Sequence, residues 1–399
     1  LVLNFAAVPL MALVPLAGLA TVVLAGAAPP LAELSGWVAH VAVRGIVDSA
    51  ALADWWPWLQ RRTPPPALAL LALHVAALAV ASATVTPARA RRLAIACACG
   101  TTIGMAGGWW PARAAGFGGR AAAEAGLPSA LRVTVLDVGQ GDAVVVQFPS
   151  SRVMVVDTGG LAASPRFDIG RRVVSPALHA LGVREITWMV LTHGDPDHVG
   201  GAAALIDDWR PREVWEGVPV VRQGALHALR TLAGRHGAAW RRVRDGDVLS
   251  VGEVDVVVRH PPPPDWERQR VRNDDSVVIE LRYGATSIVL PGDIGAAVER
   301  RLAAGPWTSR LRVLKAAHHG SAGSSDATWL TALAPAAVVF SAGRGNPFGH
   351  PSGAALARVR AAGADTFRTD EDGAVRVVTD GYRLVIETMG GRRWLRRAG

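Results

Sequence analysis

Cysteine and lysine are nearly absent from this chain of 399 residues. Its two cysteines, Cys97 and Cys99, both fall inside an apolar stretch, where we expect small packing residues. So few thiols exclude a disulfide framework and a thiolate zinc site. Charge is also scarce early on, since residues 1–127 carry eight arginines and four acidic residues, whereas 128–399 carry 34 basic and 29 acidic residues. The chain therefore divides into an apolar first part and a polar second part.

Long apolar runs dominate the first part. Residues 1–28 carry no charge and exceed the roughly 20 residues that a membrane-spanning helix needs. Similar runs occupy 67–86 and 93–110, and the last ends in a tryptophan pair typical of a membrane interface. A cleavable signal peptide is the alternative for the first run, but no basic region precedes it. The segment 31–59 is amphipathic and either lies in the interface or lines a polar cavity. We expect transmembrane helices within 1–110, three in number with a fourth left open.

Arginines between the second and third runs bear on topology. The positive-inside rule places Arg89, Arg91 and Arg92 in a cytoplasmic loop, although Arg61 and Arg62 at the other end of the second run oppose this. The prediction is a multi-pass protein of the inner or plasma membrane whose polar part is extracytoplasmic. Because the chain starts within an apolar run, we also expect it to be the C-terminal part of a longer membrane protein.

A linker rich in Gly and Ala at 111–130 leads into a predicted folded domain at 131–390. Short runs rich in β-branched residues alternate there with helical patterns in two similar series, one over 131–209 and one over 254–363. Antiparallel hairpins followed by helices, repeated twice, predict two sheets packed face to face with helices outside. The fold class is α+β, an αββα sandwich preceded by transmembrane helices.

Polar side chains collect where the predicted strands end. They are Asp137, Asp142, Asp157, the group at 193–198, Asp293, His318 and His319. Buried polar groups carry a desolvation cost unless they are paired or bound to a cation. One edge of the sheets is therefore predicted to hold a functional site.

The stretch "THGDPDHVGG" at 192–201 concentrates this chemistry. It supplies two imidazoles and two carboxylates, from His193, Asp195, Asp197 and His198. A divalent ion of borderline hardness takes both kinds of donor, and two such ions can share a bridging carboxylate. Asp293 is the expected bridge, and His318 or His319 completes the set. The predicted cofactors are two divalent ions, Zn²⁺ or Mn²⁺.

This stretch resembles the HxHxDH signature of the metallo-β-lactamase superfamily, with Asp195 in place of the second histidine. Together with "LDVGQGDA", "VVDTGG", "NDDSVVIEL", "LPGDI", "LKAAHHGSAGSS" and "NPFGHP", it is similar to the C-terminal domain of ComEC-type competence proteins, the membrane channels of bacterial DNA uptake. The resemblance covers about residues 130 to 380. It implies that the metal ligands are His193, Asp195, Asp197, His198, Asp293 and His319. His318 would then contact a substrate phosphate, or His318 and His319 exchange these two roles. His260 or Asn273 takes the place of a further ligand, and the extra carboxylate favours Mn²⁺ more than an imidazole does.

Two metals holding a hydroxide suit attack on a phosphodiester. The expected catalytic residues are Asp197, His318, Lys315 and His350. Lys315, the one lysine, either stabilises the phosphate or is an ordinary solvated side chain, and His350 protonates the leaving oxygen. The stretch "HHGSAGSS" contains Ser321, Ser324 and Ser325. Their hydroxyl or backbone N–H groups either contact phosphate oxygens or belong to an ordinary loop.

The excess of arginine after residue 127 fits a polyanionic substrate, and no base-reading motif is visible. The expected partners are DNA, bound without sequence preference, the lipid bilayer and other DNA-uptake machinery. The predicted function is hydrolysis of incoming DNA, with one strand degraded during transformation. Two alternatives stay open: a DNA channel whose lactamase-like domain only binds or gates DNA, and hydrolysis of a small ester or lactam.

Overall fold

The computed structural model describes residues 2–55, 68–83, 87–107, 129–160, 167–263 and 267–398. The predicted linker at 111–130 lies outside the described residues except for its last two. The chain divides into two compact units, one formed by 1–63 with 73–108 and the other by 64–72 with 109–399.

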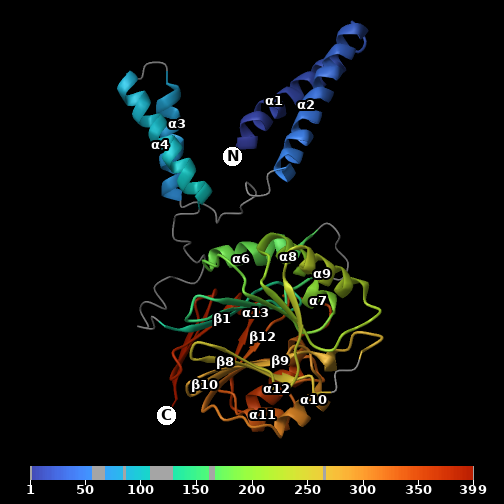
Figure 1. The fold of residues 1–399 in the computed structure, drawn as a ribbon, viewed down its shortest axis with the longest axis vertical. Helices are drawn as coiled ribbons and strands as arrows, with labels where there is room; N and C mark the ends of the chain where they lie inside the picture. The colour runs from blue at the N-terminus through green and yellow to red at the C-terminus, as the bar shows by residue number, and fades with distance from the viewer. Residues whose placement is uncertain are drawn as a thin grey trace. The chain divides into compact units, whose positions relative to one another are not determined.

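The N-terminal part consists of helices α1 (Val2–Leu24), α2 (Pro29–Trp55), α3 (Leu68–Ser82) and α4 (Ala88–Gly107). Helices α1 and α2 lie side by side (Figure 1), and the hydroxyls of Thr21 and Ser35 are 2.8 Å apart between them. His74 Nδ1 and Thr101 Oγ1 form a similar contact of 2.8 Å between α3 and α4. Within the described ranges, none of the helices is both long and apolar enough to cross a bilayer. The transmembrane helices expected within 1–110 therefore stay a prediction.

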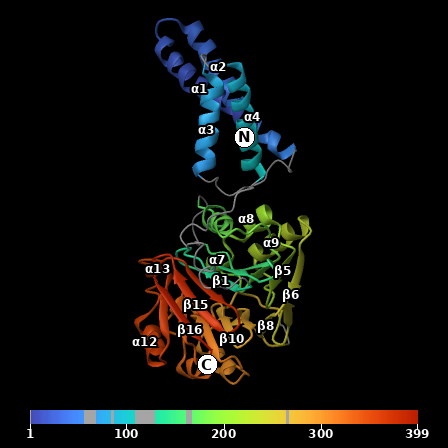
Figure 2. The ribbon, with the colours of Figure 1, turned by 90° about the vertical axis from the view of Figure 1, so that its left-hand side faces the viewer.

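The described part of the second unit contains two β-sheets with helices around them. The first contains β1 (Leu131–Val135), β2 (Val144–Gln147), β3 (Val153–Val156), β4 (Trp188–Leu191), β5 (Glu213–Glu216), β6 (Ala239–Arg242), β14 (Val375–Thr379), β15 (Arg383–Thr388) and β16 (Arg393–Arg397). Its strand order is β16-β15-β14-β1-β2-β3-β4-β5-β6. The C-terminal strands, red in Figure 2, extend this sheet beyond β1.

The second sheet contains β7 (Val248–Val251), β8 (Val254–His260), β9 (Val278–Tyr283), β10 (Thr286–Leu290), β11 (Leu311–Lys315), β12 (Ala337–Phe340) and β13 (Asp365–Arg368), in the order β13-β12-β11-β10-β9-β8-β7. The helical segments around the sheets are η2 (Gly170–Val174), α6 (Ser175–Ala180), α7 (Pro196–Val199), α8 (Ala202–Trp209), α9 (Gly224–Arg235), η3 (Asn273–Asp275), α10 (Ala296–Ala303), η4 (Ala317–Gly320), α11 (Ala327–Leu333), α12 (Gly353–Ala361) and α13 (Thr369–Asp372).

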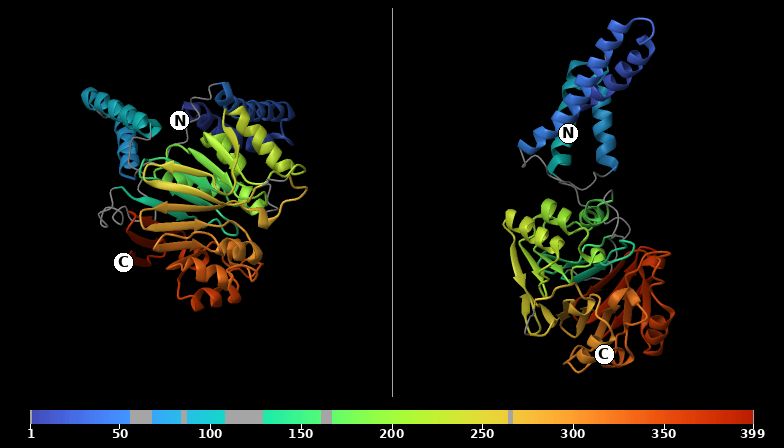
Figure 3. Two further views of the ribbon diagram at one scale, coloured as in Figure 1. Left: turned by 60° about the horizontal axis from the view of Figure 1, so that its bottom comes forward. Right: turned by 90° about the vertical axis from the view of Figure 1, so that its right-hand side faces the viewer.

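Alternation along the strands builds three apolar layers. Because successive side chains point to opposite faces, Val133 and Ile279 pack between the two sheets, while Val145 and Val338 face the helices outside. Helices α6, α8 and α9 cover one sheet and α10, α11 and α12 the other, as Figures 1 and 3 show. The predicted α+β sandwich with αββα layers is confirmed.

Several strands escape the sequence pattern. β5 reads "EVWE", β6 reads "AWRR" and β16 reads "RWLRR", so charged residues interrupt the apolar alternation that would predict a strand. They form because the neighbouring strand already offers a row of backbone partners, as in the parallel pairing of β4 with β5. Tertiary pairing thus outweighs weak local preference.

Candidate metal centre

Parallel neighbours bring distant loops to one edge of the sandwich. β3 and β4 run parallel in the first sheet, and β10 and β11 run parallel in the second. Asp157 therefore follows β3 beside the loop that follows β4, and Asp293 follows β10 beside the 3₁₀ turn that carries His318 and His319. Carboxyl ends of parallel strands share an edge, so residues over 160 positions apart meet there.

The loop of the 192–201 stretch has its shape set by a helix start and two close approaches. Asp195 is extended, with φ −74° and ψ 147°, and Pro196 opens α7, a position that proline tolerates well. A Cβ on Gly141 would lie 2.2 Å from the carbonyl oxygen of Asp197, and one on Gly160 would lie 2.0 Å from that of Pro196. Only glycine fits at both positions, which lets the backbone pack directly beneath the loop.

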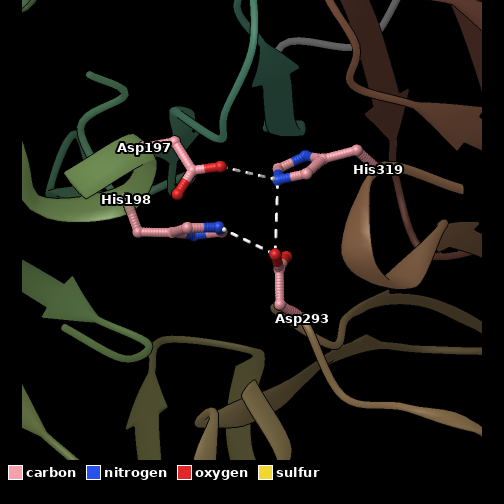
Figure 4. A group of neighbouring side chains, drawn as sticks. All are labelled: Asp197, His198, Asp293 and His319. Carbon is pink, nitrogen blue, oxygen red and sulfur yellow. Dashed lines mark ion pairs between the residues drawn. The ribbon is translucent and has the colours of Figure 1, made fainter. Parts of the chain in front are cut away.

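Four side chains converge at this edge, as Figure 4 shows. One donor atom from each of Asp197, His198, Asp293 and His319 lies within 4.8 Å of the others. Asp293 Oδ2 is 3.2 Å from His198 Nε2 and 3.3 Å from His319 Nε2, and His319 Nε2 is 3.3 Å from Asp197 Oδ2. A single carboxylate oxygen thus stands between two imidazoles from opposite sheets.

Hydrogen bonds on the far side of each ring decide which nitrogen faces the cluster. His198 Nδ1 donates to Asp157 Oδ2 at 2.7 Å, and His319 Nδ1 donates to the carbonyl oxygen of Ser341 at 3.1 Å. Thr192 donates its hydroxyl proton to Asp157, so its oxygen accepts from His193 Nδ1 at 3.2 Å. In their neutral form all three rings therefore present the Nε2 lone pair, the tautomer that a metal ligand needs.

These inward atoms fit a bound cation. In the described part of the chain, the Nε2 atoms of His193, His198 and His319 and Oδ1 of Asp293 are buried without a hydrogen-bond partner. Imidazole lone pairs that face carboxylate oxygens across 3.2–3.3 Å repel unless a positive charge lies between them. Nitrogen and carboxylate donors suit Zn²⁺ or Mn²⁺, so the residues present fit a divalent metal.

The other two predicted ligands lie beside this group. The His193 ring centre is 4.2 Å from that of His198, and His193 Nε2 is 3.3 Å from Asp195 Oδ2. The Asp195 side chain is 39% exposed, whereas that of His193 is buried. Together they form a second nitrogen and oxygen pair next to the first, as a two-metal centre requires.

Electrostatics of the cluster are set by its mixed charges. Burial opposes the charged forms, but the carboxylates of Asp293 and Asp157 raise the pKa of His198 well above its ordinary value. Burial likewise opposes ionisation of Asp293, yet His198 and His319 hold the pKa of that carboxyl well below its usual range. The site therefore keeps its carboxylates ionised and attracts cations, so that protons and metal ions compete for it.

Asp157 and Asp142 are carboxylates at strand ends for which the sequence predicts no individual role. Asp157 accepts from His198 and Thr192, and its φ of 56° lies in the left-handed region that non-glycine residues disfavour. Asp142 lies 3.3 Å from His319 Nδ1 and accepts from Lys315. Asp157 orients the ring of His198, and Asp142 lies beside the ring of His319 as a charged neighbour. The signal that could have found them is their place at strand ends that meet the cluster.

Lys315 lies behind the site rather than at its surface. Its side chain is 3% exposed and its ammonium is paired with Asp142. The interpretation as an ordinary solvated side chain is wrong, because the sandwich interior covers this strand end. The charge of Lys315 reaches His319 through Asp142.

His318 and His319 share a strained turn but occupy different surroundings. Both are left-handed, with φ of 48° and 53°. The His319 ring is buried inside the cluster, whereas His318 is 35% exposed, with Nε2 3.9 Å from Asp293 Oδ2. Asn273 Nδ2 lies 3.3 Å from His318 Nε2. The structure thus places His319 among the metal-facing groups and His318 with Asn273 at the rim.

His350 also lies at this rim, with its ring centre 5.7 Å from that of His318 and 6.2 Å from that of His319. Burial, together with the charges of His319 and His318, lowers the pKa of His350 and keeps the ring neutral near pH 7. His260 faces elsewhere, because Nδ1 bonds the Ser276 carbonyl at 2.9 Å and Nε2 accepts from Arg301 at 3.1 Å.

The three serines after the histidine pair differ in role. Ser324 donates its hydroxyl to the Ala317 carbonyl at 2.8 Å, which closes the turn. The Ser321 backbone N–H donates to the His318 carbonyl at 2.8 Å, and that of Ser325 donates to Glu299. Two of these serines therefore shape the turn, and the third is tied to α10.

Comparisons with known proteins agree with this geometry. Residues 136–344 match the model of the metallo-beta-lactamase superfamily. ComE operon protein 3 of Bacillus subtilis is 30% identical over 260 residues, 63% of this chain and 33% of the relative. Competence protein ComA of Neisseria gonorrhoeae is 34% identical over 247 residues, 61% of this chain and 32% of the relative.

Among solved structures, the metallo-beta-lactamase fold protein YhfI from Bacillus subtilis is 8% identical, with a TM-score of 0.40 over 67% of this chain and 100% of that one. The chain spans about a third of the length of the curated relatives it matches. The family match extends from the end of the first strand to the loop after β12 and so includes every residue of the metal cluster. The chain belongs to the metallo-β-lactamase superfamily.

Proposed function

We propose that this chain hydrolyses phosphodiester bonds of DNA at the metal centre, as part of DNA uptake. One observation carries the proposal: Asp293 Oδ2 lies 3.2 Å and 3.3 Å from two imidazole nitrogens while its other oxygen has no partner in the described chain. A carboxylate in that position would hold a divalent cation together with His198 and His319. A structural or gating domain gains nothing from such a metal site.

Each residue has a definite task in this proposal. His198, Asp293, His319 and Asp197 would hold one ion, with His193 and Asp195 beside a second. Bound divalent ions would supply an ionised water near neutral pH and neutralise phosphate charge. His318, partly exposed at the rim, contacts a phosphate oxygen, and neutral His350 hydrogen-bonds the leaving oxygen. Lys315 positions His319 through Asp142.

The biological setting is inferred from the relatives. Two of them are named as a ComE operon protein and a competence protein, and the similarity covers 63% and 61% of this chain. A location in the inner or plasma membrane, an extracytoplasmic sandwich, degradation of one incoming strand and contacts with other uptake machinery belong to this proposal. The runs of residues 1–110 and the arginine excess after residue 127 support it.

A DNA-binding or gating domain without catalysis is the second candidate. The arginine excess would serve such a domain equally well. It leaves unexplained why three imidazoles are held in the metal-ligating tautomer by buried hydrogen bonds. Hydrolysis of a small ester or lactam would use the same metals, and the arginine excess favours a polyanion over it.

Incubation of the purified 399-residue chain with single- and double-stranded DNA, in Mn²⁺ or Zn²⁺, tests the proposal. Asp293→Asn removes a carboxylate that would hold the metal, which should cost several kcal/mol of transition-state stabilisation. The cleavage rate should therefore fall by roughly 100-fold or more. Asp255→Asn, which alters an exposed carboxylate paired with Arg282, is the matched control and should cleave like the parent chain. DNA binding without cleavage in either metal would favour the gating domain.

A further inference from the structure

The loop between β12 and α12 presents an exposed aromatic side chain beside the metal centre. Phe348, in the "NPFGHP" motif, is 65% exposed although it lies two residues before His350. Large aromatic side chains contribute most to stability when they are buried. An exposed one at the rim of a site therefore calls for a role there.

The Phe348 ring lies close to the reacting region. It stacks on the ring of His350 with centres 5.9 Å apart and planes inclined by 26°. The His350 ring is in turn 5.7 Å from His318 and 6.2 Å from His319. One face of Phe348 is thus backed by His350, and its exposed surface lies one ring further from the metal-facing imidazoles.

A single side chain holds this loop in place. Asn346 Oδ1 accepts from the backbone N–H groups of Phe348 at 3.2 Å and His350 at 3.0 Å. Its Nδ2 donates to the carbonyl oxygens of Gly343 at 2.8 Å and His350. Gly349 supplies the positive φ of 67° that the turn between the two rings requires. The backbone that carries the Phe348 ring is therefore held beside His350.

We propose that the exposed surface of Phe348 stacks against the base of a nucleotide that adjoins the phosphate bound at the metal centre. The inference rests on the proposed function, because it assigns a base-binding subsite to the same rim. Every base has a π face, so a ring of this kind binds bases without reading their sequence. Stacking also places the neighbouring phosphate, since a fixed base limits where its own backbone can lie.

Tyr382 provides the matched comparison. It is 68% exposed, in the turn between β14 and β15. Thr379, at the end of β14, pairs with Leu131 at the start of β1, whereas Asp142 lies near the other end of that strand. Tyr382 is thus an equally exposed aromatic residue away from the metal centre.

Equilibrium binding of the 399-residue chain to two oligonucleotides tests the subsite. One is a tract of thymidines and the other an equally long tract of abasic nucleotides, both in Mn²⁺ and both joined by phosphorothioate linkages that resist cleavage, so that the backbone can still bind at the metal centre. The parent chain and Tyr382→Leu should bind the thymidine tract roughly tenfold more tightly than the abasic tract. Phe348→Leu and Phe348→Gln should bind the two tracts with affinities within about twofold of each other. Phe348→Trp should keep the preference for the thymidine tract.

Two results overturn the subsite: no preference for the thymidine tract in the parent chain, or an undiminished preference in both non-aromatic variants. Cleavage in Mn²⁺ is scored separately. A parent chain that fails to cleave while the Phe348-dependent preference holds refutes the nuclease and leaves the subsite standing. If the parent chain cleaves DNA but shows no Phe348-dependent preference, the subsite is refuted and the nuclease stands.

Discussion

Replacing Asp157 with asparagine tests whether its carboxylate sets the metal-binding tautomers. Asp157 accepts three hydrogen bonds: Oδ1 from the Thr192 N–H at 2.8 Å, and Oδ2 from the Thr192 hydroxyl at 2.6 Å and from His198 Nδ1 at 2.7 Å. An asparagine keeps the shape but turns one acceptor into a donor. Whichever way the amide is oriented, one N–H then faces another. The least costly escape is for His198 to move its proton to Nε2, which removes the lone pair that faces Asp293.

The size of this effect follows from the burial of the site. Asp157 is 1% exposed and His198 is 0% exposed, so water cannot replace the lost acceptor. Changing such an orienting partner typically weakens metal binding about 10- to 100-fold, and we expect Asp157→Asn to fall in that range. The unfavourable N–H contact should also lower the free energy of unfolding by about 1–3 kcal/mol.

Competition with a chromophoric chelator measures the metal affinity, and nitrogen-15 NMR of the imidazoles reports the tautomers. Asp168→Asn is the control, because Asp168 is a partly exposed carboxylate that pairs with Arg171 on the surface. Metal affinity in Asp157→Asn within twofold of the parent chain, with Nδ1 still protonated, would refute this account of the site.

Two further predictions concern buried charges. Lys315→Met leaves Asp142 buried without its ammonium partner, which should lower the free energy of unfolding in urea by about 3–5 kcal/mol. The double variant Lys315→Met with Asp142→Asn should recover part of that loss. A free energy of unfolding for Lys315→Met within 1 kcal/mol of the parent chain would contradict this prediction. Burial raises the pKa of Glu299 to about 7 from its ordinary 4.5, against the opposing backbone N–H groups of Asp326 and Ser325. The folded state then binds more protons than the unfolded state between these values, so this group's contribution falls by roughly 3 kcal/mol as pH rises from 4.5 through 7. Urea unfolding at pH 5 and pH 8 should show this loss in the parent chain but not in Glu299→Gln, and identical pH profiles would exclude it.

The strand-end pattern predicted much of the candidate site. The sequence shows apolar runs that end in Asp157, the 193–198 group, Asp293 and the histidine pair. The structure brings carboxylate or imidazole groups from all of them to one edge. This works because parallel strands must leave a sheet on the same side, so polar residues at their carboxyl ends have few other places to go.

Roles that depend on what lies behind a residue could not be predicted. A buried lysine and a solvated lysine look the same in sequence. Only the packing of the sandwich shows that the ammonium of Lys315 is covered and paired with Asp142. His260 looked like an available ligand, yet its two nitrogens are taken by Ser276 and Arg301. Local patterns do not record which partner a buried polar group finds.

The sequence by itself determined the α+β layering and the chemical character of one edge, because alternation of apolar residues and the ends of strands are local properties of the chain. Only the tertiary structure decided which imidazole nitrogen faces inward, which histidine of the pair enters the cluster and which carboxylates serve as supports. Those choices depend on distances of about 3 Å between groups up to 177 positions apart, from Asp142 to His319. Such contacts exist only once the two sheets have closed on each other.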